Sequence, residues 1–206
     1  IRVGRAKQIE GPYIDSNNNN MTDSNIANPN GIGNKILGGY RFGNKEGWIA
    51  PGHNSILNDN NSFYIVHHAR KEFNNKYFYM NVRKILWSND GWPMISPERY
   101  AGEKEEAIKE SDIIGRWQFI ILYRDVNRVL VGKDYEILDN KTIIGDQEGK
   151  WSLNNKNDLE LTLNLYVNIE KYIGKVLPAW DWEEDKETLV FTAISKTGEA
   201  LWGKMK

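Results

Sequence analysis

The sequence predicts an all-β fold from two observations. Short runs rich in Ile, Val, Tyr, Phe, Trp and Thr recur about every ten residues, separated by turn-forming clusters such as Asn89-Asp90-Gly91. Helical periodicity is almost absent, since only residues 102–112 resemble an amphipathic helix. We therefore expect strands joined by tight turns along nearly the whole chain.

Two regions of different character are expected, with a boundary near residues 101–112. The charged segment 103–110 lies there, as a linker or a short covering helix. Residues 1–102 form the first region, and residues 103–206 form the linker and the second. With 206 residues and 40% apolar side chains, the chain is long enough for one large domain or two small ones.

The first region has six strand candidates, of which the last four make a meander: residues 1–7, 11–14, 53–58, 62–70, 78–87 and 92–95. A weak repeat relates residues 1–13 to residues 82–93, because both copies have a strand, a tight turn and an aromatic beside a proline. This pattern predicts propeller blades, with residues 1–14 as the outer half of a blade. Two blades alone would expose unpaired edges, so we expect an N-terminal partner segment.

A long connection joins the two predicted blades. Residues 15–47 are polar and glycine-rich, and they include an asparagine run at 17–20. A connection of this length is either functional or disordered. We expect the asparagine run to form a solvent-exposed tip.

The second region has eight strand candidates and a ninth that would close the set: residues 115–123, 128–131, 135–138, 141–144, 149–153, 159–166, 171–180, 188–195 and 200–205. Leucines alternate with polar residues over 159–165, which is typical of a strand with one buried face. A closed antiparallel barrel is the simplest arrangement of so many short strands, because closure removes the edges.

The charge balance argues against two classes of partner. The 27 Lys and Arg are offset by 28 Asp and Glu, so the net charge of -1 offers no basic surface for a nucleic acid or an anionic membrane. No run approaches the roughly 18 apolar residues that a spanning helix needs. The absence of cysteine excludes thiolate metal sites but leaves the compartment open.

The histidines are the first candidates for a site. His53 follows a small Pro-Gly turn at the start of a strand, where it would point toward a propeller axis or cap the turn by hydrogen bonding. His67 and His68 are adjacent in a strand, so their side chains must point to opposite faces. Arg70 shares the face of His68, where it would hold a polar substrate or pair with a carboxylate.

Carboxylates and tryptophans give weaker signals. No carboxylate has a setting that favours acid or base chemistry, and the acidic residues at 181–185 are interpreted as a solvated turn rather than a calcium site. Tryptophan stacks on sugar rings, and Trp48 and Trp92, beside loops, are candidates for that role. The other three tryptophans considered are expected in the core: Trp117, Trp151 and Trp202.

Several motifs, taken in order, resemble glycoside hydrolase family 43. The first region carries IRVGR at 1–5, EGPY at 10–13, PGHNS at 51–55, VHHAR at 66–70, DGWP at 90–93 and PERYAGE at 97–103. The second carries GKW at 149–151, YIG at 172–174 with Trp180, FTA at 191–193 and ALWG at 200–203. The chain looks most like the secreted endo-1,5-α-L-arabinanases that have an extra C-terminal β-barrel domain.

The resemblance implies the last blades of a five-bladed propeller followed by that barrel. It implies inverting hydrolysis of arabinan by three acidic residues that all precede the match to Ile1, so no catalytic residue maps onto this chain. It also implies that His53 ligates one metal ion, calcium in such enzymes, at the propeller axis, and that the protein is secreted and extracellular. His67-His68 departs from the Tyr-His that relatives often have.

Three hypotheses follow from the sequence. The chain is the C-terminal portion of an arabinan hydrolase that acts only with its N-terminal half, a non-catalytic carbohydrate-binding fragment, or a structural fragment. In the first, Arg70 and Trp48 would bind substrate. The first predicts an N-terminal partner and a metal at His53, whereas the second predicts sugar binding without either.

Overall fold

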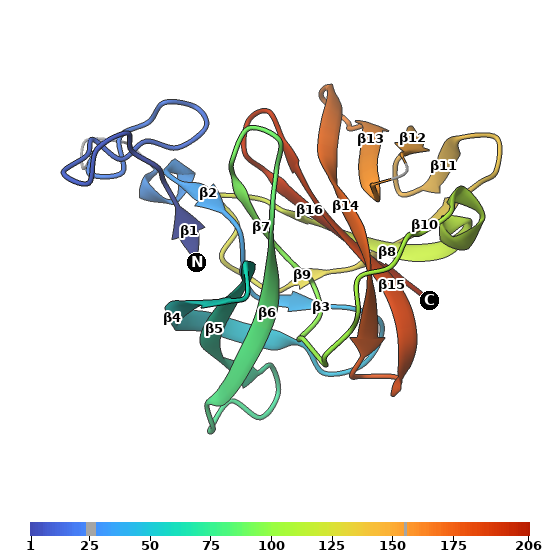
Figure 1. Ribbon diagram of the computed structural model, residues 1–206, viewed down its shortest axis with the longest axis horizontal. Helices are drawn as coiled ribbons and strands as arrows, with labels where there is room; N and C mark the ends of the chain where they lie inside the picture. The colour runs from blue at the N-terminus through green and yellow to red at the C-terminus, as the bar shows by residue number, and fades with distance from the viewer. Residues whose placement is uncertain (24–27, 155) are drawn as a thin grey trace.

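The computed structural model describes residues 1–23, 28–154 and 156–206, and it places an open β-sheet beside a closed β-barrel (Figure 1). The all-β prediction is confirmed. Within the described residues, the only helices are two short 3-10 turns, η1 Pro29–Gly31 and η2 Glu110–Ile113. Of the predicted helical segment 102–112, only the residues that belong to η2 are helical. Neither of the two helices is long or apolar enough to cross a membrane.

Eight antiparallel strands close the barrel, as expected from the sequence. In spatial order they are β10 Lys133–Ile137, β11 Thr142–Gly145, β12 Gly149–Leu153, β13 Asp158–Asn164, β14 Ile169–Asp181, β15 Lys186–Ser195, β16 Ala200–Met205 and β8 Gly115–Leu122. The alternating leucines Leu159, Leu161 and Leu163 point into a core with Trp117 and Phe191. Burial of one face of β13 therefore explains the period of two in its sequence.

One strand candidate of the second region does not join the barrel. The run at residues 128–131 gives β9 Leu130–Val131, which pairs in parallel with β3 Tyr40–Arg41. β9 thus extends the sheet of the first region. The run is too short for its sequence pattern to reveal which sheet it joins.

The sheet has the order β7-β6-β5-β4-β3-β9. The predicted meander is confirmed and consists of β4 Trp48–Asp59, β5 Ser62–Lys71, β6 Tyr79–Trp87 and β7 Pro93–Ile95. β3 pairs with β4 only at Tyr40 and Trp48. The outer edge of β4 beyond Trp48 therefore has no partner strand in the described part of the chain.

The N-terminal segment differs from its expected hairpin. β1 Arg2–Val3 pairs with β2 Asn34–Lys35. Residues 11–14 form no strand, and only Ile14 makes isolated bridges, to Arg5 and to Asn20. Pro12 lacks an N–H to donate, and Gly11 has a φ of +94°, so this stretch cannot continue a regular ladder. The weak repeat in the sequence does not correspond to a two-stranded sheet.

The long connection after residue 14 is anchored to the barrel. The buried carboxylate of Asp15 accepts backbone N–H groups from Asn17, Asn19 and Gly33, and it pairs with Arg124 at 2.8 Å. These hydrogen bonds outweigh the effect of burial and hold the pKa of Asp15 below its usual value. Most of the asparagine run is exposed, as expected, and residues 24–27 lie outside the described residues.

The sheet and the barrel share a hydrophobic core. Tyr40, Ile65 and Ile95 of the sheet pack in one cluster with Leu122 and Trp202 of the barrel. The rings of Tyr40 and Trp202 meet edge to face, with centroids 5.2 Å apart. The expected core positions of Trp117, Trp151 and Trp202 are confirmed, since each is 4% exposed or less.

Candidate functional site

A distorted segment of β4 carries the Pro-Gly-His motif. Ala50 and His53 both have a φ of +49°, and the register against β5 shifts between Ile49 and Gly52 and again between Gly52 and Ser55. Positive φ is uncommon outside glycine, and bulges of this kind redirect side chains beside functional sites. The local backbone thus gives His53 an orientation that a regular strand would not.

His53 is exposed and lies against His68 of β5. The two imidazole centroids are 6.0 Å apart, and His68 also contacts the ring of Phe78 edge to face, with centroids 4.8 Å apart. Within the described residues, no hydrogen bond or ion pair engages the His53 side chain, so it does not cap the turn. Two imidazoles therefore share one face at the distorted end of β4 and β5.

His67 points to the opposite face, as the sequence predicts for adjacent strand residues. It is 2% exposed, its Nδ1 lies 2.9 Å from the carbonyl of His68, and its Nε2 accepts a hydrogen bond from Nε of Arg83 at 3.2 Å. Burial, with the Arg83 charge adding to it, lowers the pKa of His67 to about 4. His67 is a neutral structural residue of the sheet interior.

Arg70 lies on the face of His68, as expected. Its guanidinium stacks over the ring of Phe78 at 4.0 Å, and it forms no ion pair with any described carboxylate. The Nε of Arg70 is buried and has no hydrogen-bond acceptor in the described chain. A buried N–H group that lacks an acceptor can donate a hydrogen bond to a polar group of a ligand.

The structure places Trp48 under other side chains. The indole is 3% exposed, Lys71 lies 4.1 Å from its ring centroid, and its Nε1 donates to Glu183 at 3.4 Å. Trp92 is also buried, with Arg5 stacked 4.2 Å from its ring. A buried indole offers no face on which a sugar ring could stack. The contact between Trp48 and Glu183 joins segments far apart in the chain, so no local sequence pattern predicts this burial.

A buried cluster of charges next to Trp48 was not foreseen. The ammonium of Lys204 on β16 contacts carboxylate oxygens of Glu98, Asp181 and Glu183 at 2.9, 3.0 and 3.4 Å. The interpretation of Asp181 and Glu183 as parts of a solvated turn is wrong, because the turn folds back onto Lys204. Glu184 and Asp185 are exposed, as that interpretation requires.

The cluster has the spacing of a metal site but already contains a cation. The three carboxylates offer oxygens within 4.8 Å of one another, and Lys204 lies among them. Burial raises the pKa of Glu98 to about 7, whereas the carboxylates outweigh burial at Lys204 and raise its pKa. The cluster therefore joins the end of the sheet to the barrel rather than forming a free acidic pair.

Comparison with known proteins bears on the whole chain. The family model of the glycoside hydrolase family 43 C-terminal lipocalin-like domain matches residues 97–203, just over half of the 206 residues. The chain belongs to this family. The matched range contains seven of the barrel strands in full and β16 as far as Gly203, together with the segment that carries Glu98.

Two curated relatives extend the match to the sheet. The chain is 31% identical to an extracellular endo-α-(1→5)-L-arabinanase of Bacillus subtilis and 27% identical to that of Thermotoga petrophila. Each alignment covers 98% of this chain, but only 46% and 45% of the respective relatives. The chain therefore spans about half the length of the curated relatives it matches.

Solved structures agree with this result. A family 43 glycoside hydrolase of Bacillus licheniformis superposes with a TM-score of 0.91 at 31% identity, over 99% of this chain and 48% of that one. The endo-1,5-α-L-arabinanase of Thermotoga petrophila gives a TM-score of 0.92 at 25% identity, over 100% and 48%. The expected resemblance to family 43 is confirmed, for the sheet as well as for the barrel.

Proposed function

We propose that this chain is the C-terminal portion of a secreted glycoside hydrolase that cleaves α-1,5-L-arabinan by inversion, with catalytic carboxylates from an N-terminal segment outside residues 1–206. The observation that carries the proposal is the coverage: arabinanases match 98% of this chain but the chain matches less than half of each of them. Both of these relatives are named as extracellular proteins, which supports the same location here.

The charges of the described residues support an external source of the catalytic groups. Inverting hydrolysis needs an acid and a base carboxyl roughly 6.5–9.5 Å apart, with room for a water between them. Among the described residues, the one group of three carboxylates close enough to share a metal ion surrounds Lys204. These carboxylates already contact the Lys204 ammonium, so they do not form a free acid and base pair.

The open sheet supports a propeller. In the proposed enzyme, the meander β4–β7 is a complete blade of a five-bladed propeller, and β4 is its innermost strand. The unpaired edge of β4 beyond Trp48 is then close to the channel and to the missing blades. His53, on the bulged part of this strand, would point toward the axis.

His53 would be the ligand that this chain supplies to a metal ion. The exposed imidazole, without a hydrogen bond in the described chain and held on a strained backbone, fits such a role. Calcium prefers oxygen ligands, so waters and groups outside this chain would complete the shell. The ion would supply positive charge beside the catalytic carboxyls and thereby affect their proton affinities. Arg70 would hold a polar group of the substrate.

A second candidate is a non-catalytic carbohydrate-binding fragment. The closed barrel, which needs no other segment to complete its hydrogen bonding, favours it. This candidate predicts that the protein binds arabinan but does not cleave it, with or without a metal at His53.

The test is the cleavage of debranched arabinan by the protein expressed from its complete coding region. The variant His53→Ala should lose bound metal and at least about tenfold in kcat, as is usual when a metal ligand or its support is removed. The variant Asn58→Ala, at an exposed position of the same strand, is the matched control and should match wild type. Binding without any cleavage by the wild type would favour the second candidate.

A further inference from the structure

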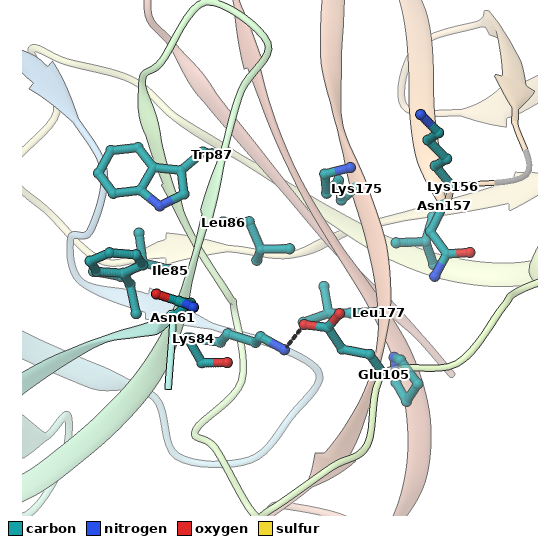
Figure 2. Close-up of a pocket in the computed structure, with 14 residues that line it drawn as sticks. Asn61, Lys84, Ile85, Leu86, Trp87, Glu105, Lys156, Asn157, Lys175 and Leu177 are labelled. Carbon is teal, nitrogen blue, oxygen red and sulfur yellow. Dashed lines mark hydrogen bonds and ion pairs between the residues drawn. The ribbon is translucent and has the colours of Figure 1, made fainter. Parts of the chain in front are cut away.

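A cleft between the sheet and the barrel has features of a second binding site. It has a volume of about 350 Å³ and is lined by β5 and β6 on one side and by β14 with the β12–β13 connection on the other. Figure 2 shows Trp87 on the β6 side and Lys156 and Lys175 on the opposite side, with Leu86 and Leu177 between them. Clefts between packed units are common locations for ligands.

Trp87 offers an aromatic platform at this cleft. Its side chain is 46% exposed, although it belongs to a regular strand. The ring of Phe63 meets it edge to face at 5.7 Å and 89°, which holds the indole in place. A fixed, half-exposed indole can stack on the C–H face of a sugar ring with little loss of side-chain entropy.

The rest of the cleft carries an excess of positive charge. Three ammonium groups line it, those of Lys84, Lys156 and Lys175, against one lining carboxylate, Glu105. Lys84 pairs with Glu105, which is itself 77% exposed, and Lys175 pairs with Asp158 just outside the cleft. Lys156 forms no ion pair with any described residue. The chain as a whole has a net charge of -1, so this local excess is not a general property of its surface.

We propose that this cleft binds an acidic oligosaccharide, one whose sugar rings carry carboxylates. A ring would stack on Trp87 above the apolar base formed by Leu86 and Leu177, and its carboxylate would reach Lys156 or displace Glu105 from Lys84. A neutral sugar would leave the ammonium excess unused, and a flexible acidic peptide would leave the indole face unused. The choice of a sugar rests on the proposed carbohydrate-active function.

The cleft is separate from the face of His53. It lies at the Trp87 end of β6 and involves the barrel, whereas His53 and Arg70 lie beside the Tyr79 end of β6. Binding in the cleft would hold the protein on an acidic polysaccharide without entering the proposed catalytic face. Loss of the cleft site should therefore leave arabinan cleavage unchanged.

The experiment is calorimetric titration of the protein, expressed from its complete coding region, with tetragalacturonate and separately with neutral arabinotetraose. We expect binding of tetragalacturonate that weakens as salt is raised and is about tenfold weaker in Trp87→Ala. Lys156→Gln should weaken it by a smaller factor. Trp182→Ala, which removes another half-exposed indole, is the matched control and should bind as wild type does.

Three results would overturn the inference: no binding of tetragalacturonate, equal binding of arabinotetraose, or binding unaffected by Trp87→Ala. Equal binding of polyglutamate would show that charge alone is recognised and would overturn the sugar assignment. If Trp87→Ala fails to fold, the indole N–H resonance of Trp87 in the wild type must shift on titration. Arabinan cleavage, measured in parallel, reports on the proposed function independently of this site.

Discussion

The barrel and the sheet satisfy their backbones in different ways. Each of the eight barrel strands pairs on both sides, so the barrel needs nothing from outside to complete its ladder. The sheet ends at β7 and β9, and most of the outer edge of β4 has no partner in the described residues. Unpaired edges are usually covered in native proteins. The comparison teaches that the barrel completes its own backbone hydrogen bonding, whereas the sheet leaves most of one edge of β4 unpaired among the described residues.

The two regions are nevertheless joined by groups that neither could bury alone. Trp202 of the barrel lies in the core of the sheet, and Lys204 of the same strand holds Glu98 at the end of the sheet. Arg124, after β8, holds Asp15 of the N-terminal segment. Strand β16 therefore forms part of the barrel wall and also contributes Trp202 and Lys204 to the contact between the barrel and the sheet. We call this contact the joint.

The largest expected loss of stability comes from removing a buried tryptophan, either Trp202 at the joint or Trp151 in the barrel core. Trp202→Ala should reduce the free energy of unfolding by about 3–5 kcal/mol, because it leaves a large cavity under both regions. Trp151→Ala, in the barrel core, should have a similar cost. Hydrogen exchange distinguishes them: the first should increase exchange in the sheet and the barrel, the second chiefly in the barrel. The same pattern in both variants would contradict a shared core at Trp202.

A second variant tests the charge cluster at the joint. Lys204→Met leaves three carboxylates buried without their cation, so urea unfolding should show a loss of about 3–5 kcal/mol. Adding Glu98→Gln to this variant removes one of the stranded charges and should restore part of the loss. A double variant no more stable than Lys204→Met would mean that Glu98 does not interact with Lys204 in the folded protein.

The pH dependence of stability tests the interior of the sheet. The pKa of His67 is about 4 in the fold, below its ordinary 6.5, so the unfolded chain takes up a proton first as the pH falls. Its contribution is full above pH 6.5 and is lost as the pH falls to about 4. His67→Gln should flatten the stability profile in that window, measured by urea unfolding. An unchanged slope in His67→Gln would contradict a neutral, buried His67.

The smallest effect is expected at an exposed pair on the barrel. Lys171 and Glu160 lie 2.7 Å apart, but their side chains are 53% and 46% exposed. Lys171→Ala should therefore change the free energy of unfolding by less than about 0.5 kcal/mol in a thermal or urea melt. A loss of unfolding free energy as large as that of Lys204→Met would contradict the account, because it would mean that burial does not set the strength of these ion pairs.

The sequence predicts local features well and distant contacts poorly. Alternation at Leu159 to Leu163 and turn residues between strands define the barrel, because both signals act within a few positions. The opposite faces of His67 and His68 follow from strand geometry alone. In contrast, the burial of Trp48 depends on Glu183, and the cluster at Lys204 joins residues up to 106 positions apart. No local pattern records such contacts.

The account is tested most directly by comparing arabinan cleavage by residues 1–206 alone with cleavage by the protein expressed from its complete coding region. The proposed function predicts release of arabino-oligosaccharides by the complete protein and none by the isolated chain, because the catalytic carboxylates lie outside it. Intact mass spectrometry of the native material would establish which polypeptide is present in each sample. Cleavage by residues 1–206 alone, or none by the complete protein, would contradict the account.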